Sequence, residues 1–124
     1  MTQGCAFSVS EGALLIVDRA DGHVVWHGKP LDAPVDEVSP LPGGNAAIVL
    51  LDYMAGPPGP FANLICVNCA GDITWRGELP TKSSTEAYVE FSLHDFALSA
   101  NSWSGHRVGL DLETGQIRDS EFTK

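Results

Sequence analysis

Two of the three cysteines form a CxxC motif, Cys66-Val-Asn-Cys69, the arrangement found in redox dithiols and in half of many zinc sites. A thioredoxin-like dithiol lies at the start of a helix, whereas this motif runs from an apolar segment into a turn. A structural zinc ion needs four ligands, and the sequence has no second CxxC or CxxH. We therefore expect a buried Cys66 beside a turn residue, Cys69, with neither redox chemistry nor a metal.

His23 and His27 have the spacing at which two imidazoles chelate zinc from one face of a helix. The residues between them, Val-Val-Trp, favour a β-strand instead. Residues four apart in a strand are separated by about 13 Å, so one ion could not contact both rings. The pair is predicted to face solvent or to be partly buried.

His94 and Asp95 could form a hydrolytic triad with a nearby serine. The serines in question are Ser99, Ser102 and Ser104. The sequence contains no G-x-S-x-G elbow and no evident oxyanion-hole loop, so no triad is predicted. Glu86 and Glu90 share one face of an expected strand and are predicted to form a solvated acidic face, not an acid/base pair.

The elements that must position these residues follow an internal repeat of strand, polar turn, glycine and strand. The three copies are LLIVDRADGHVVW (14–26), LICVNCAGDITW (64–75) and VGLDLETGQIRD (108–119). Gly22, Gly71 and Gly115 lie at the turns, separated by 49 and 44 residues. Because glycine adopts positive φ without steric cost, each copy is predicted to be a β-hairpin.

The position four residues after each turn glycine holds tryptophan in two of the copies. These residues are Trp26, Trp75 and Asp119, so the third copy lacks the tryptophan. VDRADGHVVW and GLDLETGQI resemble the blade repeat of quinoprotein-like (PQQ-type) β-propellers, apolar-x-apolar-Asp-x-x-Thr-Gly-x-apolar-x-Trp. The run at 101–115 and the terminal FTK are also similar to small uncharacterised bacterial proteins of this size. The resemblance implies antiparallel sheets and no cofactor, because quinone binding in that family needs a full ring of blades.

About eleven short strands are predicted, and no helix. Two four-stranded units are expected at 35–39, 46–52, 62–68 and 73–77, and at 87–91, 96–101, 105–111 and 116–119. A partial unit is expected at 6–9, 14–17 and 23–27. A closed propeller needs at least about four blades, so residues 1–124 are predicted to form one all-β domain, as an incomplete propeller or a compact barrel or sandwich. Open edges could also pair two chains into a homodimer.

The charge of the chain bears on its partners. Its 124 residues include 7 Lys+Arg and 16 Asp+Glu, giving a formal net charge of −9. This charge opposes binding to nucleic acids or anionic membranes, which depends on Lys and Arg clusters. The first ten residues carry no apolar run of the length of a signal-peptide core, and the longest apolar run, 46–51, is far shorter than the roughly 20 residues of a membrane span. Three cysteines are too few for a disulfide framework, so free thiols and a cytoplasmic location are predicted.

The Pro-Gly segment Met54–Phe61 (MAGPPGPF) and Trp103 are the most distinctive candidates for recognition. The predicted partner-binding residues are Asp32, Asp36, Glu37, Tyr53, Phe61, Glu86, Glu90 and Trp103. We expect a non-enzymatic cytoplasmic protein that binds a basic protein partner, by analogy with immunity proteins that neutralise a toxin. One alternative is a metal- or ligand-dependent enzyme using His23, His27, His94, His106 or the CxxC. A second is a structural subunit that pairs through open sheet edges.

Overall fold

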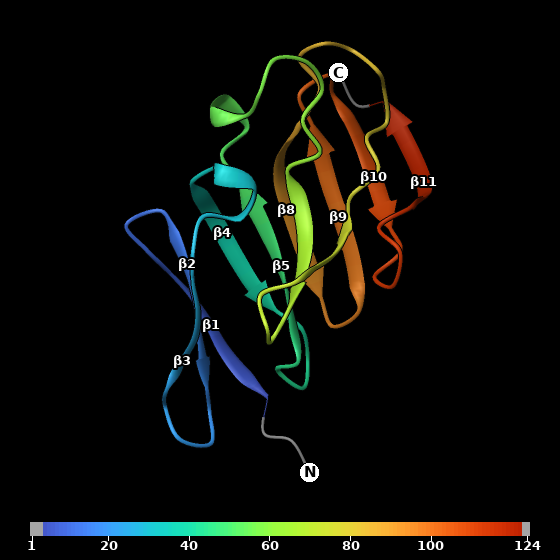
Figure 1. Cartoon of the computed structure of the whole chain (residues 1–124). Coiled ribbons are helices and arrows are strands. Elements are labelled where there is room, and N and C mark those ends of the chain that lie inside the picture. Colours follow the sequence, from blue (N-terminus) through green and yellow to red (C-terminus); the bar gives the residue numbers. More distant parts are fainter. Residues whose placement is uncertain (1–3, 123–124) are drawn as a thin grey trace.

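The computed structural model describes residues 4–122, which form eleven strands in three antiparallel sheets (Figure 1). The first sheet contains β1 (Cys5–Ser10), β2 (Ala13–Asp18) and β3 (Val24–Gly28). The second contains β4 (Val35–Pro40), β5 (Ala46–Leu51), β6 (Leu64–Asn68) and β7 (Ile73–Arg76). The third contains β8 (Tyr88–His94), β9 (Ala97–Ser102), β10 (His106–Leu110) and β11 (Ile117–Phe122). We call these sheets the first, second and third blade.

Each blade is an antiparallel meander in which strands adjacent in sequence pair with one another. The predicted all-β fold, with two four-stranded units and one partial unit, is confirmed. Over the described residues the sheets stay separate and close no barrel, so the incomplete propeller is the correct one of the predicted architectures. No helix in this part of the chain is long and apolar enough to cross a membrane.

The blades lie face to face, and the second blade is covered on both sides (Figure 1). One core cluster joins the first and second blades through residues such as Phe7, Ile16 and Val49. The other joins the second and third blades through residues such as Ile48 and Val108. Because alternate side chains of β5 enter opposite clusters, its sequence AAIVLL is apolar throughout and does not alternate with polar residues.

The repeat explains how one blade joins the next. Trp26 of the first blade lies over the turn glycine of the second, where a Cβ atom on Gly71 would come 2.5 Å from the indole. Trp75 of the second blade lies in the same way over Gly115 of the third. Its indole Nε1–H also donates a 2.7 Å hydrogen bond to the carbonyl oxygen of Leu112. The two tryptophans of the repeat are therefore inter-blade contacts.

The remaining turn glycine, Gly22 of the first blade, has an open face. A Cβ atom there would meet no described atom within 4 Å. The matching residue of the third blade, Asp119, is exposed on β11. The contact of a tryptophan on a turn glycine therefore has no partner at either outer blade. On the first blade no described side chain covers Gly22, and on the third blade Asp119 stands in place of the tryptophan.

A disulfide between Cys5 and Cys69 adds a covalent link between the first two blades, with their Cα atoms 5.8 Å apart. The prediction that all three thiols are free, with Cys69 an incidental turn residue, is therefore wrong. The expectation for Cys66 is confirmed, since it is buried and unpaired. Burial raises the pKa of the Cys66 thiol, which disfavours the reactive thiolate. The CxxC motif thus divides into a core residue and a structural cross-link.

Candidate functional site

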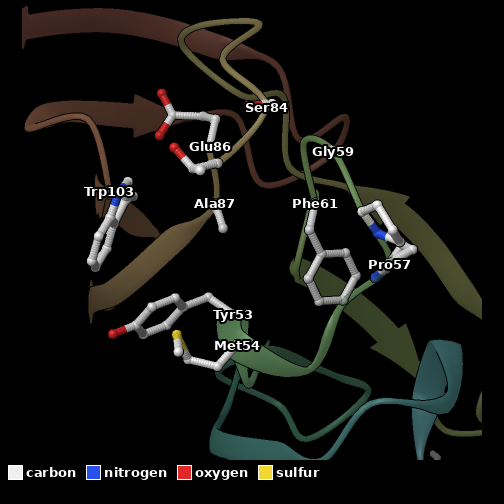
Figure 2. Close-up of a pocket in the computed structure, with 11 residues that line it drawn as sticks. Tyr53, Met54, Pro57, Gly59, Phe61, Ser84, Glu86, Ala87 and Trp103 are labelled. Carbon is white, nitrogen blue, oxygen red and sulfur yellow. The ribbon is translucent and has the colours of Figure 1, made fainter.

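A pocket of about 280 Å³ lies between the loops of the second and third blades (Figure 2). Its walls come from the β5–β6 connection, the segment preceding β8 and the β9–β10 turn. We call it the aromatic pocket and define it by Tyr53, Met54, Pro57, Phe61, Ala87 and Trp103. In Figure 2 the Phe61 and Trp103 rings stand on opposite sides, and the Ala87 methyl points into the space between them.

The Pro-Gly segment is held in place by local contacts. Asp52 caps the 3-10 turn η2 (Tyr53–Ala55) by accepting a 2.9 Å hydrogen bond from the Met54 N–H. The Phe61 ring packs against Gly56, where a Cβ atom would come 2.2 Å from it. The Phe61 N–H donates to the carbonyl oxygen of Glu86 at 2.9 Å. The segment is therefore held against the chain that leads into β8 of the third blade before any partner binds.

Tyr53 and Trp103 join the two blades at the rim of the pocket. Their ring centroids are 5.5 Å apart, with the planes tilted by 36°. The backbone N–H of Trp103 donates a 2.8 Å hydrogen bond to the carbonyl oxygen of Ala87, which fixes the β9–β10 turn. Trp103 is nevertheless 48% exposed and Met54 is 76% exposed. The rim thus presents large apolar side chains to solvent on an ordered backbone.

Asn63 joins the second and third blades by hydrogen bonds of its side chain to the backbone of both. It is fully buried, and its Nδ2 donates to the carbonyl oxygens of Leu51 and Tyr88, both at 2.8 Å. Its Oδ1 accepts the Tyr88 N–H, also at 2.8 Å. All of the polar atoms of the side chain are therefore satisfied. Asn63 is a positioning residue that the sequence analysis did not identify.

Glu86 is only 1% exposed, so the predicted solvated acidic face is wrong at this position. Its carboxylate accepts hydrogen bonds from the Thr81 hydroxyl at 2.6 Å and from the Ser104 hydroxyl and N–H at 2.6 and 3.2 Å. Burial alone would raise the pKa of Glu86, but these hydrogen bonds outweigh it and hold the pKa below its usual range. In Figure 2 the carboxylate points away from Phe61 and Tyr53. Glu86 therefore stabilises the pocket wall through its hydrogen bonds to Thr81 and Ser104 and does not direct its charge into the pocket.

Ser104 also contacts a histidine, since its Oγ lies 2.9 Å from Nδ1 of His106. The serine lies between the carboxylate and the imidazole, whereas a hydrolytic triad places the histidine between them. The hydroxyl donates to Glu86 and so offers no proton to His106. Among the candidate combinations with His94, the one with Ser102 does not assemble. Ser102 pairs with Tyr88 at the first residue of β8, about 20 Å along the strand from His94 at its last residue.

The remaining predicted residues lie outside the aromatic pocket. Glu90 is exposed on β8 and accepts a 2.6 Å hydrogen bond from Nδ2 of Asn101. Asp36 and Glu37 are exposed on β4, and Asp32 is exposed in the 3-10 turn η1 (Pro30–Asp32). Of the eight predicted residues, the structure brings four to the pocket: Tyr53, Phe61, Glu86 and Trp103. Phe61 is itself buried, so it forms a wall and not the rim.

Among the described residues, one group could hold a metal ion. Ligand atoms of Asp18, Asp21 and His23 lie within 4.8 Å of one another at the β2–β3 turn. His23 Nδ1 is 2.5 Å from an Asp21 carboxylate oxygen, and Asp18 accepts the Ala20 N–H at 2.7 Å. Hydrogen bonds from the His23 N–H and ring lower the pKa of Asp21, and the same carboxylate raises that of His23. Turn-stabilising contacts therefore account for this group, which does not include His27.

The blades define the chain as a propeller-type β protein with an aromatic pocket at an inter-blade loop cluster. It belongs to the family described as Domain of unknown function (DUF7957), whose model matches residues 30–122. The match begins at η1 and contains the second and third blades. No curated protein matches the chain.

Solved structures share the fold at low sequence identity. The β-propeller domain of Cps50 (Swd1) from Myceliophteria thermophila matches with a TM-score of 0.66 at 16% identity, over 97% of this chain and 38% of that one. BamB from Moraxella catarrhalis matches with a TM-score of 0.61 at 18% identity, over 99% of this chain and 34% of that one. The computationally designed Ika4 protein matches with a TM-score of 0.65 at 12% identity, over 100% of this chain and 70% of that one. The chain thus spans about a third of the length of both natural propellers.

Proposed function

We propose that this protein is a non-enzymatic binding protein that holds a protein partner through the aromatic pocket and its rim. The observation that carries the proposal is the exposure of Trp103 and Met54 on a backbone already fixed by hydrogen bonds. Exposed tryptophan beside a preformed pocket is typical of binding anchors. A fixed backbone also loses little conformational entropy when a partner docks.

We also propose that the protein is not an enzyme. Two features support this: Ser104 lies between Glu86 and His106, which is not the order of a hydrolytic triad, and the CxxC cysteines are separated into a buried thiol, Cys66, and a disulfide cysteine, Cys69. The alternative of a metal- or ligand-dependent enzyme has the Asp18, Asp21 and His23 group as its strongest support. That group is accounted for by contacts within its own turn.

We propose a basic protein as the partner, because the formal net charge is −9. Asp52 and Asp36 lie beside η2, and burial together with the charge of Asp52 raises the pKa of Asp36. Neutralisation of a toxin, in the manner of an immunity protein, is the specific role we propose. The cytoplasmic location remains our prediction, and the Cys5–Cys69 disulfide weighs against it because disulfides persist in oxidising compartments.

A structural subunit is a second candidate, and a specific observation favours it. Over the described residues the first blade lacks the strand that would pair with β1, at the place that β4 takes in the second blade, and it presents the open face of Gly22. A strand of another chain, or of a second copy, could pair with β1, and an aromatic side chain packed on Gly22 would complete a contact of the kind that Trp26 makes at Gly71. We also propose that the repeat is quinoprotein-like, supported by the packing of its defining tryptophans on its turn glycines.

The proposed function is tested by affinity capture from the native host, at low and at high salt, with identification of the captured proteins. Wild-type protein is compared with Trp103→Leu and with a matched control, Phe96→Leu, which alters an exposed aromatic residue on the β8–β9 turn. We expect one basic partner to be retained by wild type and Phe96→Leu and lost with Trp103→Leu. Recovery of no partner at either salt would contradict the proposal.

A further inference from the structure

The geometry points to an arginine side chain of the partner as the group that occupies the aromatic pocket. This inference rests on the proposed function and specifies its chemistry. The pocket volume of about 280 Å³ lies just below the roughly 300–1,000 Å³ of small-molecule sites. The space therefore suits one large side chain better than a cofactor.

The charge around the pocket selects a cation. Among the described residues that line it, the one ionisable at neutral pH is Glu86, and no lysine or arginine is present. Asp52 lies at the start of η2, directly before Tyr53, with Asp36 close to it. All of these groups are acidic, so a phosphate or carboxylate ligand would be repelled while a cation would be attracted.

The walls distinguish arginine from lysine. Tyr53, Phe61 and Trp103 supply aromatic surface from both sides of the pocket. A guanidinium group is planar and weakly hydrated, and it stacks on aromatic rings, whereas an ammonium group holds its water more strongly. The Glu86 carboxylate is engaged by Thr81 and Ser104, so little in the pocket replaces the hydration shell of an ammonium group. The pocket therefore favours arginine, whose guanidinium group loses its hydration water at a lower cost in free energy than the ammonium group of lysine.

Exposure of the rim fits entry from a neighbouring protein surface. Met54 and Trp103 are open to solvent on opposite blades, and the Ala87 methyl lies between the walls. The stem of an arginine side chain can pack on these apolar groups while the guanidinium stacks on the rings. The guanidinium then needs no direct ion pair with Glu86, whose carboxylate points away from the pocket.

The test uses the full chain with its disulfide intact and the tripeptide acetyl-Gly-Arg-Gly-amide as the probe. Binding is followed by NMR through the Trp103 indole N–H, the Ala87 methyl and the Met54 methyl. We expect saturable shifts of these signals in the millimolar range. Three further peptides replace arginine with citrulline, lysine or proline. Citrulline keeps the shape of arginine without its charge, and we expect its peptide to bind about tenfold more weakly.

Matched variants assign the binding to the pocket. Trp103→Leu and Tyr53→Leu are expected to abolish the shifts at Ala87, while Phe96→Leu retains them. Equal binding of the arginine and citrulline peptides would overturn the inference. So would preferential binding of the proline or lysine peptide, or unchanged binding by Trp103→Leu. If the peptide fails but Trp103→Leu still releases the captured partner, the arginine inference fails and the proposed function stands.

Discussion

The indole of Trp26 occupies the space directly over Gly71, so that any side chain at Gly71 would come within 2.5 Å of the ring. This contact lies in the same turn as Cys69, which is disulfide-bonded to Cys5. The β6–β7 turn of the second blade therefore carries both an apolar and a covalent contact to the first blade. Gly115 repeats the apolar contact one blade further along.

Alanine at the three turn glycines should have unequal effects. All three have positive φ, so each substitution carries a backbone cost of about 1–2 kcal/mol. At Gly71 and Gly115 the new methyl would also collide with an indole, adding roughly 1–3 kcal/mol. Gly22→Ala serves as the matched control because its Cβ meets open space. Urea unfolding would measure the three free energies of unfolding, and equal losses would show that the indole contacts contribute nothing.

Loss of the Cys5–Cys69 disulfide should destabilise the protein substantially. The cysteines are 64 residues apart, and chain-entropy estimates for a loop of this length give about 4 kcal/mol. We expect the midpoint of urea unfolding to fall on reduction in wild type but to be insensitive to reductant in Cys5→Ser. Cys66→Ala is the control for nonspecific effects of reductant and should keep the wild-type response, since Cys66 is unpaired. An unchanged midpoint in reduced wild type would contradict this prediction.

Glu86 should make stability depend on pH in the acidic range. Its folded-state pKa lies below the ordinary value of 4.5, so its charged form stabilises the native state above that value. This contribution should be lost as the pH falls from about 4.5 through the folded-state pKa. Glu86→Gln should lose roughly 1–3 kcal/mol at pH 7, because its amide leaves a donor from Thr81 or Ser104 unpaired. The free energy of unfolding of wild type and of Glu86→Gln is measured at pH 7, 5 and 3. We expect the difference between them to narrow as the pH falls, and a constant difference would show that the charge of Glu86 does not stabilise the native state.

Asp119→Trp should promote self-association. The substitution restores the tryptophan of the repeat on the third blade, while the first blade presents the open face of Gly22. A tryptophan from one molecule could then pack on Gly22 of the next, a contact that does not close on itself. Sedimentation velocity over a concentration series would detect the assemblies. Adding Gly22→Asn, which tolerates positive φ but fills the open face, should reverse the effect.

The strands could be predicted from the sequence because the information that defines them is local. The turn glycines and the alternation in segments such as Val24-Val25-Trp26-His27 act within a single hairpin. Tyr53 and Trp103 were also accessible as candidates, since aromatic residues next to Pro-Gly or serine-rich turns suggest recognition. Their contact across two blades was not accessible, because 50 residues separate them and no local pattern links them.

The errors concern groups whose partners are distant in the sequence. Glu86 is buried because Ser104, 18 residues away, supplies two hydrogen bonds to its carboxylate. Nothing local in the sequence indicates this burial, and the spacing of Glu86 and Glu90 instead predicts a solvated acidic face. Cys5 and Cys69 could be paired only by knowing how β1 sits against the β6–β7 turn. The odd number of cysteines favoured the wrong interpretation.

The position of the disulfide also determines how the protein would respond to mechanical tension. Cys5 and Cys69 close a covalent loop that contains the first blade and the strands β4, β5 and β6. A pulling force applied at residues 4 and 122 would pass through the sulfur–sulfur bond and bypass that loop. Extension would be limited to the chain after Cys69, which holds β7 and the third blade. Stretching of a single molecule would therefore release less than half of its length until the bond is reduced.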